Sequence, residues 1–214
     1  MKNKPRSGWS SNTDRGRIGD VKNGHFIDIN YDGTFLLYGN MTAFDDLKFP
    51  STGINPPGAV DDPDRDTSTG LLVFDSSKTE TVAMVVQLSH SWKEGSDLFP
   101  HVHWMKSSSA SGDVVWQLEY KWAPIGEVAD ASWTTLSSYT LAGGTIDTNT
   151  EDKHLITPLG TITSTGKQIS DMIMMKLSRV GGDANDTYGA DAQLLEFDIH
   201  FEVDSFGSNQ EYIK

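Results

Sequence analysis

The sequence predicts an all-β protein, namely an antiparallel two-sheet sandwich of the jelly-roll type with a non-globular N-terminal arm. Several segments alternate apolar and polar residues with the period of two that is typical of half-buried strands. Turn-forming residues, among them 20 glycines, separate these segments. The chain shows no confident helix and no internal repeat, so about nine or ten strands must build the core between them, as they do in a jelly roll.

Residues 1–24 form the predicted arm. They lack periodicity and are rich in glycine, serine and asparagine, a composition that buries too little apolar surface to fold alone. Six basic residues against two acidic ones give this segment a net charge of +4, which leaves −17 on the rest of a chain whose total is −13. Such asymmetry favours docking onto an acidic partner, for instance a neighbouring copy, although the arm folding back onto its own body is an equal alternative.

The predicted sandwich covers residues 25–203 and opens with a hairpin. Residues 25–31 alternate as a strand, the pair Asp32-Gly33 is a tight-turn signal, and residues 34–38 return as the partner strand. The segments expected to follow are an irregular stretch over residues 39–49, a long loop over 50–70, a short strand over 71–75, and a strand over 81–89 that is buried on both faces.

Residues 98–122 read as a hairpin of two aromatic-rich strands. In the first strand, Val102 and Trp104 point to the core, which turns His101 and His103 outward. The second strand places four large apolar side chains on one face, namely Trp116, Leu118, Tyr120 and Trp122.

Four further strands are predicted, over residues 133–141, 154–162, 169–180 and 190–203. Pro158 suits an edge position for its strand, because proline cannot donate to a ladder. The last strand is the longest alternating segment, and its pattern points Leu195 and Phe197 inward and Leu194 and His200 outward. A polar tail over residues 204–214 closes the chain.

Composition excludes several classes of protein. The chain has no cysteine, which removes disulfides and thiolate metal sites together. The net charge of −13 argues against a nucleic-acid binder, because phosphate contacts need lysine and arginine. No apolar run approaches the length that spans a bilayer, and no signal-peptide core follows Met1. We therefore expect a soluble chain, made in the cytoplasm, that binds neither nucleic acid nor membrane.

The histidines are the candidate metal ligands. His101 and His103 share one strand face, and His200 lies beside Asp198 on the polar face of another long strand. If those strands are neighbours, three histidines and one carboxylate would make a metal site. Jelly-roll metalloenzymes of the cupin type carry a similar His-x-His pair, but a glutamate ligand closely follows theirs and none follows here. We expect outward polar residues with no cofactor, and keep a metal site as the alternative.

Other functional signals are weaker. The sequence contains no glycine-rich phosphate loop, nucleophile elbow or Cys/His pair, so we do not expect an enzyme. Trp9, Trp92, Trp133 and Tyr139 are the residues that could stack on sugars if they line an open groove. Packing in the core or in an interface is the more common fate of tryptophan.

Three stretches carry a resemblance to a known group of proteins. They are FPHVHW at residues 99–104, GDVVWQLEYKWAPIGE at 112–127, and the ending YGADAQLLEFDIHFEVDSFGSNQEYIK at 188–214. In these the chain resembles virion structural proteins of tailed bacteriophages, which tend to share the histidine-rich strand, the W-x-L-E-Y phrase and the terminal Asp-Ser-x-Gly-Ser-x-x-Glu-Tyr pattern. The phrase at residues 42–47, followed by Phe49-Pro50, fits the same group.

The resemblance implies a non-enzymatic virion component made in the host cytoplasm. We expect it to assemble with its own copies and with other virion proteins at the head–tail connector, the tail or the fibre attachment region. Residues 1–24 and 204–214 are expected to make most of these contacts, by adding strands to a neighbour or wrapping it. The alternatives are a capsid decoration protein, a carbohydrate-binding module for a host-surface glycan, and a jelly-roll metalloenzyme built on His101, His103 and His200.

Overall fold

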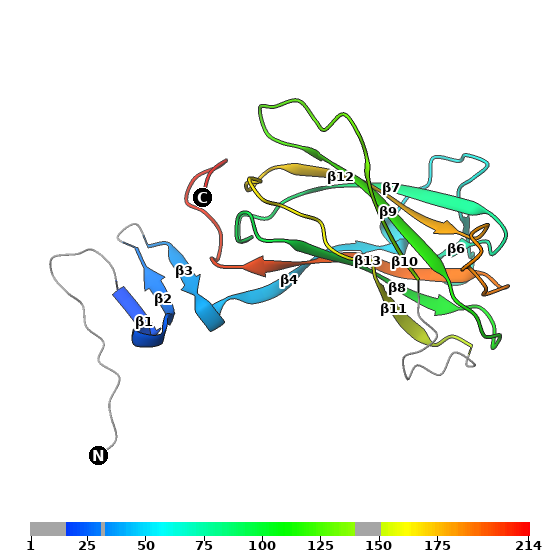
Figure 1. The fold of residues 1–214 in the computed structure, drawn as a ribbon, viewed down its shortest axis with the longest axis horizontal. Coiled ribbons are helices and arrows are strands. Elements are labelled where there is room, and N and C mark those ends of the chain that lie inside the picture. Colours follow the sequence, from blue (N-terminus) through cyan, green and yellow to red (C-terminus); the bar gives the residue numbers. More distant parts are fainter. Residues whose placement is uncertain (1–15, 31–32, 140–150) are drawn as a thin grey trace, which may run out of the picture.

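The computed structural model describes residues 16–30, 33–139 and 151–214 of the chain. Two antiparallel sheets pack face to face, and a third, smaller sheet lies beside them (Figure 1). The predicted all-β antiparallel sandwich of the jelly-roll type is confirmed. Among the described residues, no helix has the length and apolar character needed to cross a membrane.

One sheet of the sandwich has four strands. Their order across the sheet is β10 (Thr134–Tyr139), β9 (Val115–Ala123), β12 (Met172–Val180) and β7 (Thr79–Gln87). β7 is therefore an edge strand, and its burial alternates, with Val85 exposed. The prediction that this segment is buried on both faces is wrong, because its second face meets solvent.

The other sheet is organised around the last strand. Its order is β11 (His154–Pro158), β8 (Leu98–Lys106), β13 (Ala192–Val203), β6 (Leu72–Phe74) and β5 (Asp64–Arg65), and β4 (Ala43–Pro50) also pairs with β13. β4 and β6 pair with successive parts of the same edge of β13. The irregular stretch predicted before Pro50 is thus largely a strand, whereas Pro158 does lie in an edge strand.

The third sheet is formed near the N-terminus by β1 (Gly16–Asp20), β2 (His25–Ile29) and β3 (Phe35–Tyr38), paired in that order. The pairing of β2 with β3 confirms the hairpin predicted there. Three single 3-10 turns, η1 (Val21–Asn23), η2 (Gly39–Met41) and η3 (Ser51–Gly53), complete the regular elements of the described residues.

The predicted boundary after residue 24 is wrong in two respects. β1 lies inside the proposed arm and pairs with β2 over its whole length, so this part of the arm is a strand. The sandwich proper begins only at β4, because β2 and β3 belong to the separate sheet. Gly19 permits the β1–β2 approach, since a Cβ there would lie 2.6 Å from the carbonyl oxygen of His25. Residues 1–15 of the predicted arm lie outside the described residues.

The aromatic hairpin predicted over residues 98–122 is also wrong, although its faces are right. β8 and β9 belong to opposite sheets, and the chain crosses from one layer to the other between them. Their aromatic faces therefore meet across the core, where the rings of Trp104 and Trp116 have centroids 6.3 Å apart. Burial of such large rings on both sheets supplies much of the hydrophobic free energy that holds the layers together.

A β-bulge changes the faces of the last strand. The register of β13 against β8 shifts between Leu194 and Glu196, which inserts one extra residue. Leu194 is consequently buried and Leu195 only half-buried, the reverse of the predicted pattern. Beyond the bulge the alternation resumes, with Phe197 and Ile199 in the core.

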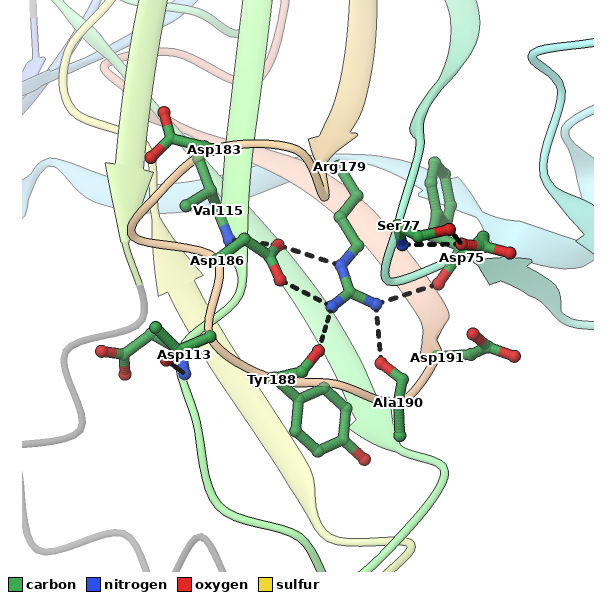
Figure 2. Close-up of polar contacts among 12 residues, drawn as sticks. Asp75, Ser77, Asp113, Val115, Arg179, Asp183, Asp186, Tyr188, Ala190 and Asp191 are labelled. Atoms are coloured by element: carbon green, nitrogen blue, oxygen red, sulfur yellow. Dashed lines mark hydrogen bonds and ion pairs between the residues drawn. The ribbon is translucent and has the colours of Figure 1, made fainter.

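A buried ion pair lies at one end of the sandwich (Figure 2), and its arginine also reaches the other sheet by donating to the carbonyl oxygen of Phe74 in β6. The side chains of Arg179, at the end of β12, and Asp186, in the following loop, are both fully buried. Arg179 uses every N–H donor of its guanidinium, which satisfies the buried charge completely. Its acceptors are both carboxylate oxygens of Asp186, at 2.7 and 3.0 Å, and the carbonyl oxygens of Phe74, Tyr188 and Ala190 at 3.0, 2.6 and 2.8 Å.

Replacing Asp186 by alanine should destabilise the fold strongly, because it leaves a buried guanidinium without its counter-charge. Removing one partner of a buried pair costs about 3–5 kcal/mol. The matched control is Lys93→Ala, which breaks the half-exposed pair with Glu202 at 2.9 Å and should cost about 0–1 kcal/mol. Urea denaturation with an unchanged slope measures both, and equal losses for the two variants would contradict this account.

Candidate functional site

The pairing of three strands gathers histidines and aspartates on the outer face of the larger sheet. β8 and β13 are neighbours, and their register sets His101 opposite Asp198. β13 and β4 are neighbours on the other side, where His200 stands opposite Asp46. Since side chains alternate along a strand, His103 shares the outer face with His101. The structure thus brings together all three histidines that the sequence singled out, His101, His103 and His200, with the carboxylate of Asp198.

Asp198 lies at the centre of this cluster. Its Oδ1 is 3.0 Å from Nε2 of His101, and its Oδ2 is 3.4 Å from Nε2 of His103. His200 extends the row, with its ring centroid 4.1 Å from that of His101 and its Nε2 2.8 Å from Oδ1 of Asp46. We call the set His101, His103, Asp198, His200 and Asp46 the His–Asp cluster.

Outer contacts hold the two β8 histidines in place. Nδ1 of His101 lies 3.1 Å from the carbonyl oxygen of Phe99, which only accepts, so this nitrogen carries the proton and donates. Nδ1 of His103 lies 2.8 Å from Nε2 of His154 in β11. The sequence alone does not indicate that His154 contacts His103, because this contact arises from the pairing of β11 with β8.

Burial and nearby charges shift the pKa values of His101 and His103 in opposite directions. The contact with the carboxylate of Asp198 raises the pKa of His101 above its ordinary value, against the opposing effect of burial. Burial lowers the pKa of His103, and the nearby charges of His101 and His154 act in the same direction. The pKa values of two adjacent imidazoles are therefore shifted in opposite directions, because His101 is dominated by its contact with Asp198 and His103 by burial.

The donor atoms of the cluster suit a metal ion of the kind that imidazole and carboxylate bind. One ligand atom each from His101, His103 and Asp198 lies within 4.8 Å of the others, and the same holds for Asp46, Asp198 and His200. The two sets share Asp198. Its side chain is 4% exposed, against 12% for His101 and 20% for His103, so the histidines lie between the carboxylate and solvent.

The tryptophans proposed as a sugar-stacking surface are not brought together. Trp92 is fully buried in the core, which overturns its assignment to an open groove. Trp133 is half-buried and lies under two lysines, with Nζ of Lys176 and of Lys121 at 4.3 and 5.1 Å from its ring centroid. Trp9 and the side chain of Tyr139 lie outside what the structure describes.

Comparison with known proteins adds no assignment. No protein-family model matches the chain, and no curated protein matches it. Among solved structures it is similar to dimeric latent PorU from Porphyromonas gingivalis, at 9% identity over 76% of this chain and 13% of that one, with a TM-score of 0.34. It is similar to Eiger TNF from S. frugiperda, at 11% identity over 80% of this chain and 98% of that one, with a TM-score of 0.27. It is also similar to the non-crystalline-cellulose-specific carbohydrate-binding module CBM28, at 8% identity over 92% of this chain and 83% of that one, with a TM-score of 0.25. The chain spans only a small part of PorU, and these similarities carry no functional argument.

In protein kept metal-free with a chelator, His101 should titrate above the ordinary histidine pKa and His103 below it. Asp198→Asn removes the central negative charge while keeping the side-chain shape, so the pKa of both imidazoles should fall. Histidine resonances followed by NMR across the pH range measure both values. Asp183→Asn, in the loop after β12, is the control that should leave them unchanged. Two unshifted and equal titrations in the wild-type chain would contradict the electrostatic account.

Proposed function

We propose that this protein is a structural subunit of a tailed-phage virion that acts by assembling with copies of itself and with other virion proteins. The virion setting is supported by the sequence resemblance of residues 99–104, 112–127 and 188–214. The mode of action is supported by the geometry of the β1–β3 sheet. That sheet is the single observation on which the assembly role rests.

The β1–β3 sheet lies beside the sandwich rather than in it, and β4 leads from one to the other (Figure 1). It is tied to the C-terminal segment, since the N–H of Leu37 donates to the carbonyl oxygen of Asp204 at 2.5 Å and Leu36 forms a bridge with Ser205. The rings of Phe35 and Phe206 meet edge to face, with centroids 5.6 Å apart. Among the residues of its three strands only Asp28 is buried, so the sheet builds no apolar core of its own, and a second surface would complete it.

Exposed apolar side chains gather at the same end of the molecule. Of the fifteen large apolar residues that the described chain exposes, nine lie in residues 16–44, which hold the β1–β3 sheet, its turns and the start of β4, or in the tail after β13. A concentration of this kind marks an interaction surface, whereas single exposed apolar residues do not. We call this surface the apolar end, and its most exposed members are Ile18, Phe44, Phe206, Tyr212 and Ile213.

Charge favours a second copy of the same chain as one occupant. Residues 1–24 carry a net charge of +4, and β1, within that segment, belongs to the apolar end, whereas the remainder of the chain carries −17. The arm of one subunit therefore complements the body of the next in charge as well as covering apolar surface. β1 lies at an edge of its sheet, where a strand of a neighbour can add by main-chain hydrogen bonds.

The same arrangement also serves a capsid decoration protein, which remains the alternative within this class. A glycan-binding role is less well supported, since Trp92 is in the core. For a metalloenzyme, the His–Asp cluster would have to supply the chemistry.

Aspartate substitutions at the apolar end should dissociate the oligomer. Ile18→Asp, Phe44→Asp and Phe206→Asp each place a charge where the contact is proposed, at side chains exposed enough to leave folding intact. Each should weaken self-association by about tenfold or more, as loss of an interface anchor does. Sedimentation equilibrium of the full chain measures the effect. Val60→Asp and Val128→Asp are the controls, because these residues are 97% and 92% exposed and lie in loops of the sandwich. A monomeric wild-type chain, or equal effects of all five variants, would contradict self-assembly.

Incorporation into particles tests the virion setting separately. A tagged Phe44→Asp chain, expressed in cells that produce the phage, should be depleted from purified particles relative to a tagged Val128→Asp chain. Mass spectrometry of the particles gives the ratio. The absence of both the wild-type and the control chain from particles would refute the virion setting while leaving self-association standing.

A further inference from the structure

We propose that His101, His103 and Asp198 bind one divalent transition-metal ion, which clips β8 to β13 on the outer face of the larger sheet. His101 and His103 supply Nε2, and Asp198 supplies its carboxylate. This inference does not depend on the proposed virion role, because it rests only on the cluster itself.

The spacing of the donor atoms fits a transition metal. Zn–N and Zn–O bonds of about 2.0–2.1 Å in a tetrahedral site put neighbouring ligand atoms about 3.3–3.4 Å apart. The observed separations are 3.0 Å from Oδ1 of Asp198 to Nε2 of His101 and 3.4 Å from its Oδ2 to Nε2 of His103, and one ligand atom from each of the three residues lies within 4.8 Å of the others. An ion can therefore enter with small side-chain movements, and three protein ligands leave a fourth position for water.

Asp198 carries the second, independent observation. The residue is 3% exposed, and its Oδ1 accepts no hydrogen bond of regular geometry although Nε2 of His101 is close. A buried carboxylate oxygen without a hydrogen bond is costly, because it has lost its hydration without a replacement. Oδ1 faces Nε2 of His101, and the other oxygen, Oδ2, faces Nε2 of His103, so the ion would lie between the carboxylate and the two rings.

The outer contacts prepare the histidines as ligands. Metal-binding histidines almost always use their second ring nitrogen on an outer partner, which fixes the tautomer and the orientation of the ring. Nδ1 of His101 donates to the carbonyl oxygen of Phe99, so its neutral form directs a lone pair on Nε2 at Asp198. Nδ1 of His103 lies 2.8 Å from Nε2 of His154, and a proton donated there by Nδ1 would leave the lone pair of Nε2 for the ion.

The ligand chemistry selects the class of ion. Imidazole nitrogens suit Zn²⁺, Ni²⁺, Cu²⁺ and Co²⁺, whereas Ca²⁺ and Mg²⁺ require oxygen ligands. Asp46 and His200, which are 2.8 Å apart, flank the site through their common neighbour Asp198, and the carboxylate of Asp46 places a second negatively charged group beside it. Both histidine ligands are partly exposed, so the ion has a path from solvent.

Titration of the chelator-treated full chain with Co²⁺ and Zn²⁺ tests the proposal. Co²⁺ should give saturable one-to-one binding with visible absorption of a low-coordinate site, and Zn²⁺ should displace it. At a free Zn²⁺ concentration of about 100 times Kd, the midpoint of thermal unfolding should rise by about 5–10 °C. Mg²⁺ at the same concentration should give neither signal.

Variants separate the site from other histidines. His101→Ala with His103→Ala, both on the outer face, should abolish the signals, and His154→Ala should weaken binding by about 10–100-fold as loss of an outer partner does. Asp198→Asn, which keeps the side-chain shape, covers the case in which the double variant fails to fold. His25→Ala, in β2 of the separate sheet, is the matched control and should bind as the wild type does. Absence of saturable binding in the wild type, or binding retained in both cluster variants, would overturn the proposal.

Discussion

The register of β13 is the constraint on which the rest of the structure depends. This strand pairs with β8 on one side and with β4 and β6 in succession on the other, so it holds most of the larger sheet together. The same register sets Asp198 opposite His101 and His200 opposite Asp46. A shift of the β13 register by one residue would turn its core side chains to the outer face and its outer side chains to the core. Both the apolar core and the His–Asp cluster would then be lost. The β-bulge between Leu194 and Glu196 shifts the register before this part of β13, so Asp198 and His200 follow the regular pairing after it.

The two ends of the molecule differ in how well their side chains are covered. In the sandwich, every donor of the buried Arg179 guanidinium is satisfied, and large rings from both layers pack against each other between β8 and β9. At the other end the β1–β3 sheet and the C-terminal segment expose apolar side chains that the sandwich does not cover. A stable body with an incompletely covered end is what a subunit held by neighbours requires.

Sequence periodicity predicted the faces of strands well and their partners poorly. The outward position of His101 and His103 followed from alternation with Val102 and Trp104, because burial imposes a period of two on a strand. Alternation does not say which strand lies alongside, so β8 and β9 were placed in one hairpin although they lie in opposite layers. The sequence did not predict β1, because Ile18 is the one large apolar residue of this strand and gives no alternation. The strand conformation of β1 depends on its pairing with β2. For the same reason the sequence indicated His200 with Asp198 but not His154 or Asp46, which reach the cluster through β11 and β4.

Amide hydrogen exchange of the full chain at low and high protein concentration tests the central claim most directly, namely that the β1–β3 sheet is completed by a neighbouring copy. The account predicts that protection of β1 and of the residues after β13 rises with concentration, while protection in β9 and β12 stays high and constant. Protection of the β1–β3 sheet that is independent of concentration would contradict it, because the sheet would then be stable without a partner.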